Sequence, residues 1–180
     1  MRIISGQARG RKLVTLEGEN TRPTLDRTRE ALFNILQGRV LEARVLDLFA
    51  GSGALALEAL SRGALDAVLC DVSPEACAVI QKNIDAVRCG KRTRLLRCDA
   101  LSALKQLRTE QFDLIFLDPP YKKGLIGPVL AGLVEGDLLA RGALIVAETA
   151  QDEEFEIPCG LAQTDRRKYG KSCLHFIERA

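Results

Sequence analysis

From residue 44 onward, apolar segments of strand length alternate with segments of helical periodicity. The strand-like segments are residues 44–49, 66–71, 94–98, 112–117 and 142–147, and the helical ones lie near 54–62, 74–88, 100–108 and 125–139. Short apolar strands that alternate with helices form parallel sheets covered by helices on both faces. The spacing therefore predicts an α/β fold with a mostly parallel sheet.

The two ends of the chain depart from this alternation. Residues 1–16 alternate apolar with basic or polar side chains around two glycines, which indicates a short hairpin or extended arm, and Arg22-Pro23-Thr24 opens a helix. The segment from Leu161 to Ile177 is typical of a hairpin that turns at residues 169–171. We expect this hairpin to add an antiparallel pair to the parallel strands, giving a seven-stranded sheet.

The chain of 180 residues suits one domain and contains no repeat or linker that would divide it. We expect residues 1–42 to form a basic extension packed on a core of residues 43–180. No apolar run approaches the roughly 20 residues of a membrane span, and the amino terminus lacks the apolar core of a signal peptide. A cytoplasmic protein is expected.

The chain has few cysteine and histidine residues that are placed to bind a metal ion. The six cysteines include no Cys-x-x-Cys pair and are scattered through the expected strands and helices, and His175 is the only histidine. These residue types therefore predict buried or inert thiols, a structural histidine and no metal.

Asp118-Pro119-Pro120-Tyr121 directly follows the apolar run at 112–117. Two prolines cannot continue a strand ladder, so a carboxylate, a carbonyl with a fixed direction and an aromatic ring remain at the carboxyl edge of the sheet. These groups could bind a planar base that carries an exocyclic amino group. The alternative is a proline-terminated strand with a capping aspartate.

The chemistry favoured by these four residues is methyl transfer to nitrogen. An aromatic amine is a poor nucleophile because its lone pair is delocalised into the ring. The Asp118 carboxylate and the Pro119 carbonyl could accept its two N–H hydrogens and favour a tetrahedral nitrogen. Pro120 restricts Pro119 to extended geometry, and Tyr121 can stack on an extruded base.

A glycine loop, Asp47-Leu48-Phe49-Ala50-Gly51-Ser52-Gly53, falls where the first strand turns into the first helix of the alternation. Its glycines permit a tight turn and a close approach of the backbone to a ligand. The motif also satisfies a loose dinucleotide fingerprint, with Asp71 twenty residues after Gly51. The glycines alone do not decide between a dinucleotide and another adenosine-containing cofactor.

Acidic residues at three strand ends favour S-adenosylmethionine. Asp47 would repel a pyrophosphate but suits the amino and sulfonium charges of this cofactor. Asp71, with Val72 beside it, is placed for the ribose hydroxyls, and Asp99-Ala100 for the adenine, although Asp99 could instead cap a helix. The expected cofactor-binding residues are Asp47, Phe49, Ala50, Gly51, Gly53, Asp71, Val72, Asp99 and Ala100.

Positive charge is concentrated at the start of the chain. Residues 1–44 hold nine Lys/Arg against five Asp/Glu, which leaves +4, and because the whole chain is +2 the remainder is −2. The alternatives are a surface that binds a phosphate backbone and a merely solvated one. The candidate RNA contacts are Arg9, Arg11, Lys12, Arg22, Thr24, Arg27 and Arg29.

A second basic cluster surrounds Tyr169, with Arg166, Arg167, Lys168 and Lys171. Tyr169 could contact RNA, but a packed hairpin residue is the favoured interpretation.

The chain resembles class I S-adenosylmethionine-dependent methyltransferases, and more closely the bacterial family that methylates N2 of a guanine in 16S ribosomal RNA. The resemblance runs nearly from end to end and rests on residues 1–6, 9–13, 22–24, 26–27, 29–34, 47–55, 58–64 and 118–121. It implies a Rossmann-like fold and a monomeric enzyme acting on the small ribosomal subunit or an assembly intermediate. Two departures are Ala56, where the family commonly has glycine, and Asp71, where it often has glutamate.

Two other functions stay open at this point. One is amino-methylation of another target, such as adenine N6 in DNA or RNA, or a protein glutamine, since each presents an NH2 group to the same acceptors. The other is a dinucleotide-dependent oxidoreductase, against which Asp47 and the Asp118–Tyr121 stretch both count.

Overall fold

The structure is a computed structural model that describes residues 1–16 and 23–180, with residues 23–26 described by their backbone alone. Its helices are α1 (Pro23–Ile35), α2 (Gln37–Val40), α3 (Ala54–Ser61), α4 (Pro74–Val87), α5 (Ala100–Gln106) and α6 (Ile126–Glu135), with a 3-10 turn η1 at Gly90–Arg92. Its strands are β1 (Arg44–Asp47), β2 (Asp66–Asp71), β3 (Thr93–Arg97), β4 (Phe112–Leu117), β5 (Leu139–Ala150), β6 (Leu161–Tyr169) and β7 (Ser172–Arg179).

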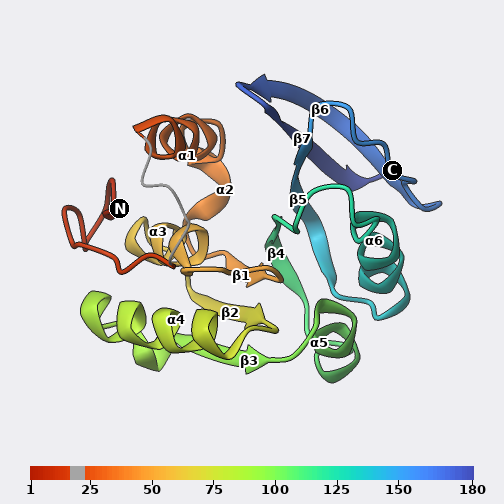
Figure 1. The fold of residues 1–180 in the computed structure, drawn as a ribbon. Helices are drawn as coiled ribbons and strands as arrows, with labels where there is room; N and C mark the ends of the chain where they lie inside the picture. Colours follow the sequence, from red (N-terminus) through yellow and green to blue (C-terminus); the bar gives the residue numbers. More distant parts are fainter. Residues whose placement is uncertain (17–22) are drawn as a thin grey trace.

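In the described part of the chain, seven strands form one sheet in the order β3-β2-β1-β4-β5-β7-β6 (Figure 1). Strands β1 to β5 are parallel, whereas β7 is antiparallel to β5 and β6 is antiparallel to β7. The predicted α/β fold with an antiparallel carboxyl-terminal hairpin is confirmed. The strand order reverses between β1 and β4, and ligands of such sheets bind at that reversal, beyond the carboxyl ends of the strands.

Helices cover both faces of this sheet, and each face has its own buried core. One core is formed by α1 to α4 against the sheet and includes Phe33 and Phe116, whose ring centroids are 6.0 Å apart. The other is formed by α5 and α6 and includes Phe112 and Leu130. Buried strands β1 and β4 are apolar on both faces for this reason.

The boundary between α6 and β5 differs from the prediction. The helix ends at Glu135, because Gly136 closes it and Asp137 adopts a left-handed φ of 51°. Strand β5 then starts at Leu139, and exposed Arg141 and Gly142 interrupt its apolar pattern at the irregular pairing with β4. Because of this interruption, the predicted strand begins at residue 142, three residues after the start of β5 at Leu139.

The amino-terminal segment forms a tight hairpin-like loop with one β-bridge, between Arg2 and Lys12. It packs on α3, where the buried Glu58 carboxylate accepts hydrogen bonds from the N–H groups of Ile4 at 2.8 Å and Ser5 at 3.0 Å. A Cβ atom on Gly6 would lie 1.8 Å from the Ser61 carbonyl oxygen, so only glycine permits this approach.

Asn83 in α4 connects the end of this segment to the glycine loop. Its Oδ1 accepts from the N–H of Val14 at 2.7 Å, and its Nδ2 donates to the carbonyls of Val14 at 2.9 Å and Ser52 at 2.8 Å. Because Asn83 is fully buried, these bonds fix the position of the segment relative to the loop.

Candidate active site

The glycine loop connects β1 to α3 at the reversal of strand order. Gly51 and Gly53 have φ values of 54° and 79°, which favour glycine, and the Gly53 N–H donates to the Ala50 carbonyl at 2.6 Å. A Cβ on Gly53 would lie 3.1 Å from Leu69 Cδ2, so the loop packs closely against β2. The turn leaves the start of α3 facing the carboxyl edge of the sheet.

Asp47 is the buried carboxylate of this site, with 1% of its surface exposed. Burial raises its pKa to about 7, although backbone N–H groups of Phe49 and Ala56 favour the charged form. Its Oδ1 atom is buried and has no hydrogen-bond partner among the described residues. A buried acceptor without a partner fits a positively charged amino group of a ligand.

Asp71 braces the loop from the end of β2. Its Oδ2 accepts from the N–H of Gly51 and its Oδ1 from the N–H of Ser73, both at 2.9 Å. A carboxylate has about four acceptor positions, so it retains capacity for ligand hydroxyl groups. The next residue, Val72, is 68% exposed and presents an apolar surface beside this carboxylate.

Asp99 is the N-cap of α5, which is the alternative considered from the sequence. It accepts from the Ser102 N–H at 3.0 Å and from the Ser102 hydroxyl at 2.6 Å, and these bonds lower the pKa of its carboxyl. Its role toward adenine therefore stays a prediction. Leu101, two residues after Asp99 in the first turn of α5, is 41% exposed.

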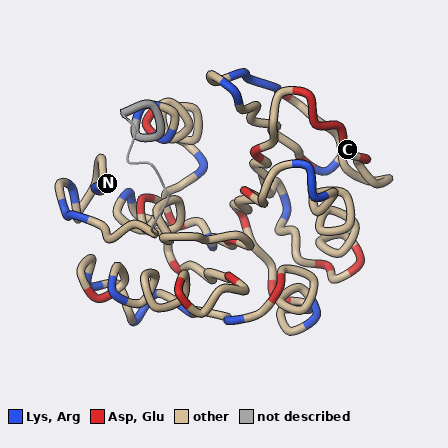
Figure 2. The backbone as a smooth tube through the Cα atoms, viewed as in Figure 1, with Lys and Arg blue, Asp and Glu red and all other residues tan. Residues whose placement is uncertain are grey.

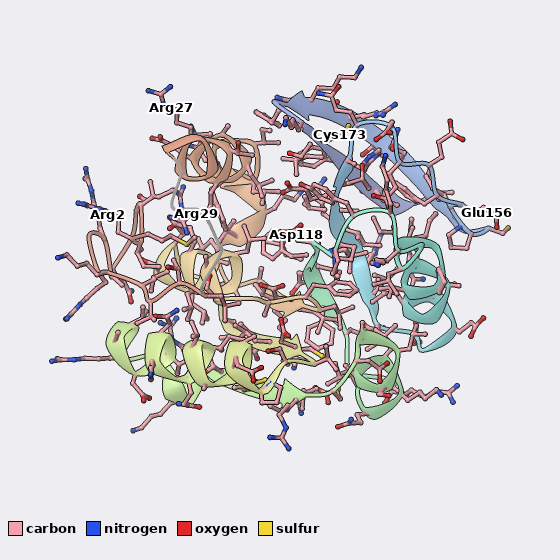
Figure 3. All side chains as sticks on the ribbon, viewed as in Figure 1. Arg2, Arg27, Arg29, Asp118, Glu156 and Cys173 are labelled. Atoms are coloured by element: carbon pink, nitrogen blue, oxygen red, sulfur yellow. The ribbon has the colours of Figure 1, made fainter. Side chains whose placement is uncertain are left out.

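The Asp118–Tyr121 stretch leaves β4 at the same edge of the sheet (Figure 3). Asp118 and Tyr121 are exposed, whereas Pro119 is buried. Figure 3 shows Asp118 near the middle of the molecule, just beyond the end of β4. The end of β4 thus places a carboxylate and an aromatic ring at the reversal of strand order, the switch point of the sheet, where ligands of such sheets bind.

Glu148 holds the ring of Tyr121, and sequence reasoning missed this residue. The Tyr121 hydroxyl donates to Glu148 Oε1 at 2.8 Å, and burial together with the Glu148 charge raises the pKa of that hydroxyl above its usual value. An ionisable residue within the buried run of β5 was the available signal. The bond links the end of β4 to β5.

Most of the described amino-terminal cations lie at the surface. Arg9, Arg11, Lys12 and Arg27 are exposed, and Figure 2 shows the basic residues along the amino-terminal segment. Three arginines, Arg2, Arg9 and Arg27, line a groove of about 330 Å³ between this segment and α1, together with Glu30.

Arg29 does not belong to this surface, so its assignment as an RNA contact is wrong. Only 6% of it is exposed, and its Nη2 donates to the backbone carbonyl of Arg2. The side chain lies between α1 and the amino-terminal segment (Figure 3) and fixes one to the other. Arg22 and the side chain of Thr24 fall outside the described residues.

The cysteines form no disulfide bonds, and the histidine is hydrogen-bonded in the interior. All six cysteines are free, and His175 is buried between Thr149 at 2.9 Å and Gln163 at 2.6 Å. Over residues 1–16 and 23–180, no three His, Cys, Asp or Glu side chains are grouped to hold a metal ion. The same part of the chain contains no helix long and apolar enough to cross a membrane.

Comparison with known proteins places this chain in a family. A family model described as Conserved hypothetical protein 95 matches residues 1–178. The chain belongs to this family. A relative from Escherichia coli (strain K12), named Ribosomal RNA small subunit methyltransferase D, is 42% identical over 149 residues, which cover 83% of this chain and 74% of the relative.

Further members of the family agree in sequence and fold. A Haemophilus influenzae protein, also named Ribosomal RNA small subunit methyltransferase D, is 38% identical over 160 residues, or 88% of this chain and 83% of that protein. The solved structure of yhhF from Escherichia coli superposes with a TM-score of 0.87 at 35% identity and covers 99% of this chain and 97% of its own. The resemblance to class I methyltransferases is confirmed.

Proposed function

We propose that this protein transfers a methyl group from S-adenosylmethionine to N2 of a guanine in 16S ribosomal RNA. The observation that carries the proposal is the position of Asp118-Pro119-Pro120-Tyr121. These residues lie at the switch point of the sheet, beside a glycine loop whose buried Asp47 carries an unpartnered oxygen. Methyltransferase relatives of the same family support the reaction class.

The residues around the glycine loop suit this cofactor. The Asp47 carboxylate would bind the amino group, and Asp71 would accept from the ribose hydroxyls while it holds the N–H of Gly51. Exposed Val72 and Leu101 offer apolar surfaces to the adenine ring, with Asp99 and Ala100 beside them. The bound cofactor supplies an electrophilic methyl group.

The chain's own contribution to the reaction is to orient and activate the guanine amine. The Asp118 carboxylate and the Pro119 carbonyl accept the two N–H hydrogens, which directs the nitrogen lone pair away from them. Tyr121, anchored by Glu148, stacks on the base and limits its rotation. The proton lost by the product nitrogen passes to Asp118 or to water.

RNA as the substrate class is supported by the relatives named as ribosomal RNA methyltransferases and by the exposed arginines of the amino-terminal segment. Arg2, Arg9 and Arg27 line one groove, where they would neutralise RNA phosphates and release the counterions of those phosphates. The assignment of guanine N2 as the methylated atom rests on the resemblance of the sequence motifs to the family that methylates this atom in 16S ribosomal RNA. The enzyme acts as a monomer on the small subunit or its assembly intermediate.

The proposal is tested with labelled S-adenosylmethionine and two substrates, small ribosomal subunits and naked 16S RNA, both from cells lacking this protein. We expect label in RNA that digests to N2-methylguanosine. Label in N6-methyladenosine would instead identify an adenine methyltransferase, and label in ribosomal protein would identify a protein methyltransferase. Subunits that already carry the modification serve as the control and should accept no label.

A further inference from the structure

The end of the β6–β7 hairpin lies at the catalytic edge of the sheet. Ser172, the first residue of β7, pairs with Ala150 at the carboxyl end of β5 and with Tyr169 at the end of β6. The turn at 170–171 is therefore on the same edge as the carboxyl ends of β5 and of β4, and the Asp118–Tyr121 stretch directly follows β4. Figure 1 shows the hairpin across the top of the view, with its turn end towards α1.

Strand register places two side chains of this hairpin on the same face as Glu148. Glu148 pairs with Leu174, and Leu174 pairs with Arg167, so the three form one row across β5, β7 and β6. Tyr169 belongs to the adjacent row on the same face. Arg167 thus lies two strand spacings, about 10 Å, from the residue that anchors Tyr121.

Basic residues lie close to Tyr169 in the sequence of the hairpin. Figure 2 shows basic residues gathered at the turn end of the hairpin. The side chains of Lys168 and Lys171 are exposed, and neither forms an ion pair with a described residue. Arg167 is paired with Asp165 at 2.8 Å, but both are about half exposed, so the pair is weak and a phosphate can replace the carboxylate.

Arg166 has a different role in the same cluster. Its Nε donates to Cys173 Sγ at 3.0 Å and its Nη2 to the Gln151 carbonyl at 3.2 Å. These bonds tie β6 to β7 and to the segment after β5. The charges available to a ligand are therefore that of Arg167 on the Glu148 face and that of exposed Lys171 in the adjoining turn.

We propose that Arg167, Tyr169 and Lys171 form a second RNA-binding surface, which holds a nucleotide next to the one that enters the active site. The two cations bind its phosphates, and the Tyr169 ring stacks on its base. This surface rests on the proposed function and adds a contact on the β6 side of Asp118, whereas the amino-terminal segment lies on the other side (Figure 3).

The test compares Arg167→Ala/Lys171→Ala with Lys91→Ala/Lys105→Ala. The control removes the same charge from exposed residues in η1 and the last turn of α5, at the opposite edge of the sheet. Affinity for 16S RNA is measured by filter binding over a range of salt concentrations. We expect about tenfold weaker binding and a smaller salt slope for the hairpin variant alone, because fewer counterions are released.

Tyr169 is tested separately, because it is partly packed on the core. Tyr169→Phe should retain RNA affinity, and Tyr169→Leu should reduce it about tenfold while binding S-adenosylmethionine normally. Equal RNA affinity and salt slope in the hairpin and control variants, with wild-type methylation intact, would overturn the second surface alone. A wild-type protein that binds RNA but never methylates it would overturn the proposed function instead.

Discussion

Asp71 accepts a hydrogen bond from the Gly51 N–H at 2.9 Å through one oxygen and from the Ser73 N–H at the same distance through the other. One carboxylate at the end of β2 therefore determines both the shape of the glycine loop and the start of α4. A residue expected to bind the ribose also preorganises the loop that binds the rest of the cofactor.

Replacing Asp71 should weaken cofactor binding more than the loss of one ligand contact would. We expect Asp71→Ala to reduce the affinity for S-adenosylmethionine about 100-fold, because two backbone donors and the ribose all lose their acceptor. Asp71→Asn should cost less, since its amide oxygen still accepts. Calorimetric titration measures both, and Asp85→Ala, an exposed change on α4, should bind as wild type.

Asp47 should make the stability of the free protein depend on pH. Its folded pKa is about 7 because of burial, with a smaller effect of the Asp71 charge, whereas the ordinary pKa of an aspartate is 3.8. Between these values the folded chain holds a proton that the unfolded chain has released. The free energy of unfolding contributed by Asp47 should therefore fall as pH rises from about 4 to 7, by at most roughly 1.4 kcal/mol per pH unit.

Urea unfolding of wild type and Asp47→Asn between pH 4.5 and 7.5 isolates this effect. The difference in free energy of unfolding between the two proteins should change in favour of the variant as pH rises. Cofactor affinity should show the opposite trend in wild type, because the amino group binds the ionised carboxylate. If the difference in free energy of unfolding between the two proteins is constant over this pH range, the raised pKa of the Asp47 carboxyl is contradicted.

Most of the fold could be predicted from sequence because its signals are local. Asp66–Asp71 and Phe112–Leu117 are strands at the predicted bounds, and Ser73 caps α4 with Pro74 at its first position, since apolar runs and caps depend on neighbouring residues only. The burial of Arg29 and the Tyr121–Glu148 bond could not be predicted. Both depend on which segments meet in space, and a charged residue in sequence gives no sign of its partner.

Asp118 should be required for methyl transfer but not for cofactor binding. We expect Asp118→Ala to lower kcat by at least about 100-fold, because one of the two acceptors that orient the amine is lost. The dissociation constant of the Asp118→Ala protein for S-adenosylmethionine should remain within about threefold of the wild-type value. Single-turnover methylation and calorimetry measure the two quantities, and a fully active Asp118→Ala protein would refute the proposed mechanism.

Tyr121 should contribute mainly through its ring. Tyr121→Phe keeps the stacking surface and loses only the hydrogen bond to Glu148, so a modest rise in KM for RNA is expected. Tyr121→Ala removes the platform and should lower kcat/KM by roughly 1 to 3 kcal/mol in transition-state stabilisation. Steady-state kinetics with both variants separate ring from hydroxyl, and equal losses would show that the hydroxyl is the essential group.

Gly6 and Gly10 offer a matched test of how the amino-terminal segment is held. Both have φ values near +80°, so alanine strains the backbone similarly at either position. A Cβ at Gly6 would also collide with the Ser61 carbonyl oxygen at 1.8 Å, whereas at Gly10 no atom lies within 4 Å. Gly6→Ala should therefore displace the segment from α3 and disrupt the bonds from Ile4 and Ser5 to Glu58.

The two variants should differ in stability and in RNA affinity. Gly10→Ala should cost about 1 kcal/mol, the ordinary penalty for a left-handed alanine, and Gly6→Ala at least twice that, because the buried Glu58 carboxylate loses backbone donors. Thermal unfolding and RNA binding are measured on both. If Gly6→Ala binds RNA as tightly as Gly10→Ala despite its lower stability, the docked position of the segment does not matter for RNA, and its arginines act as a flexible basic tail.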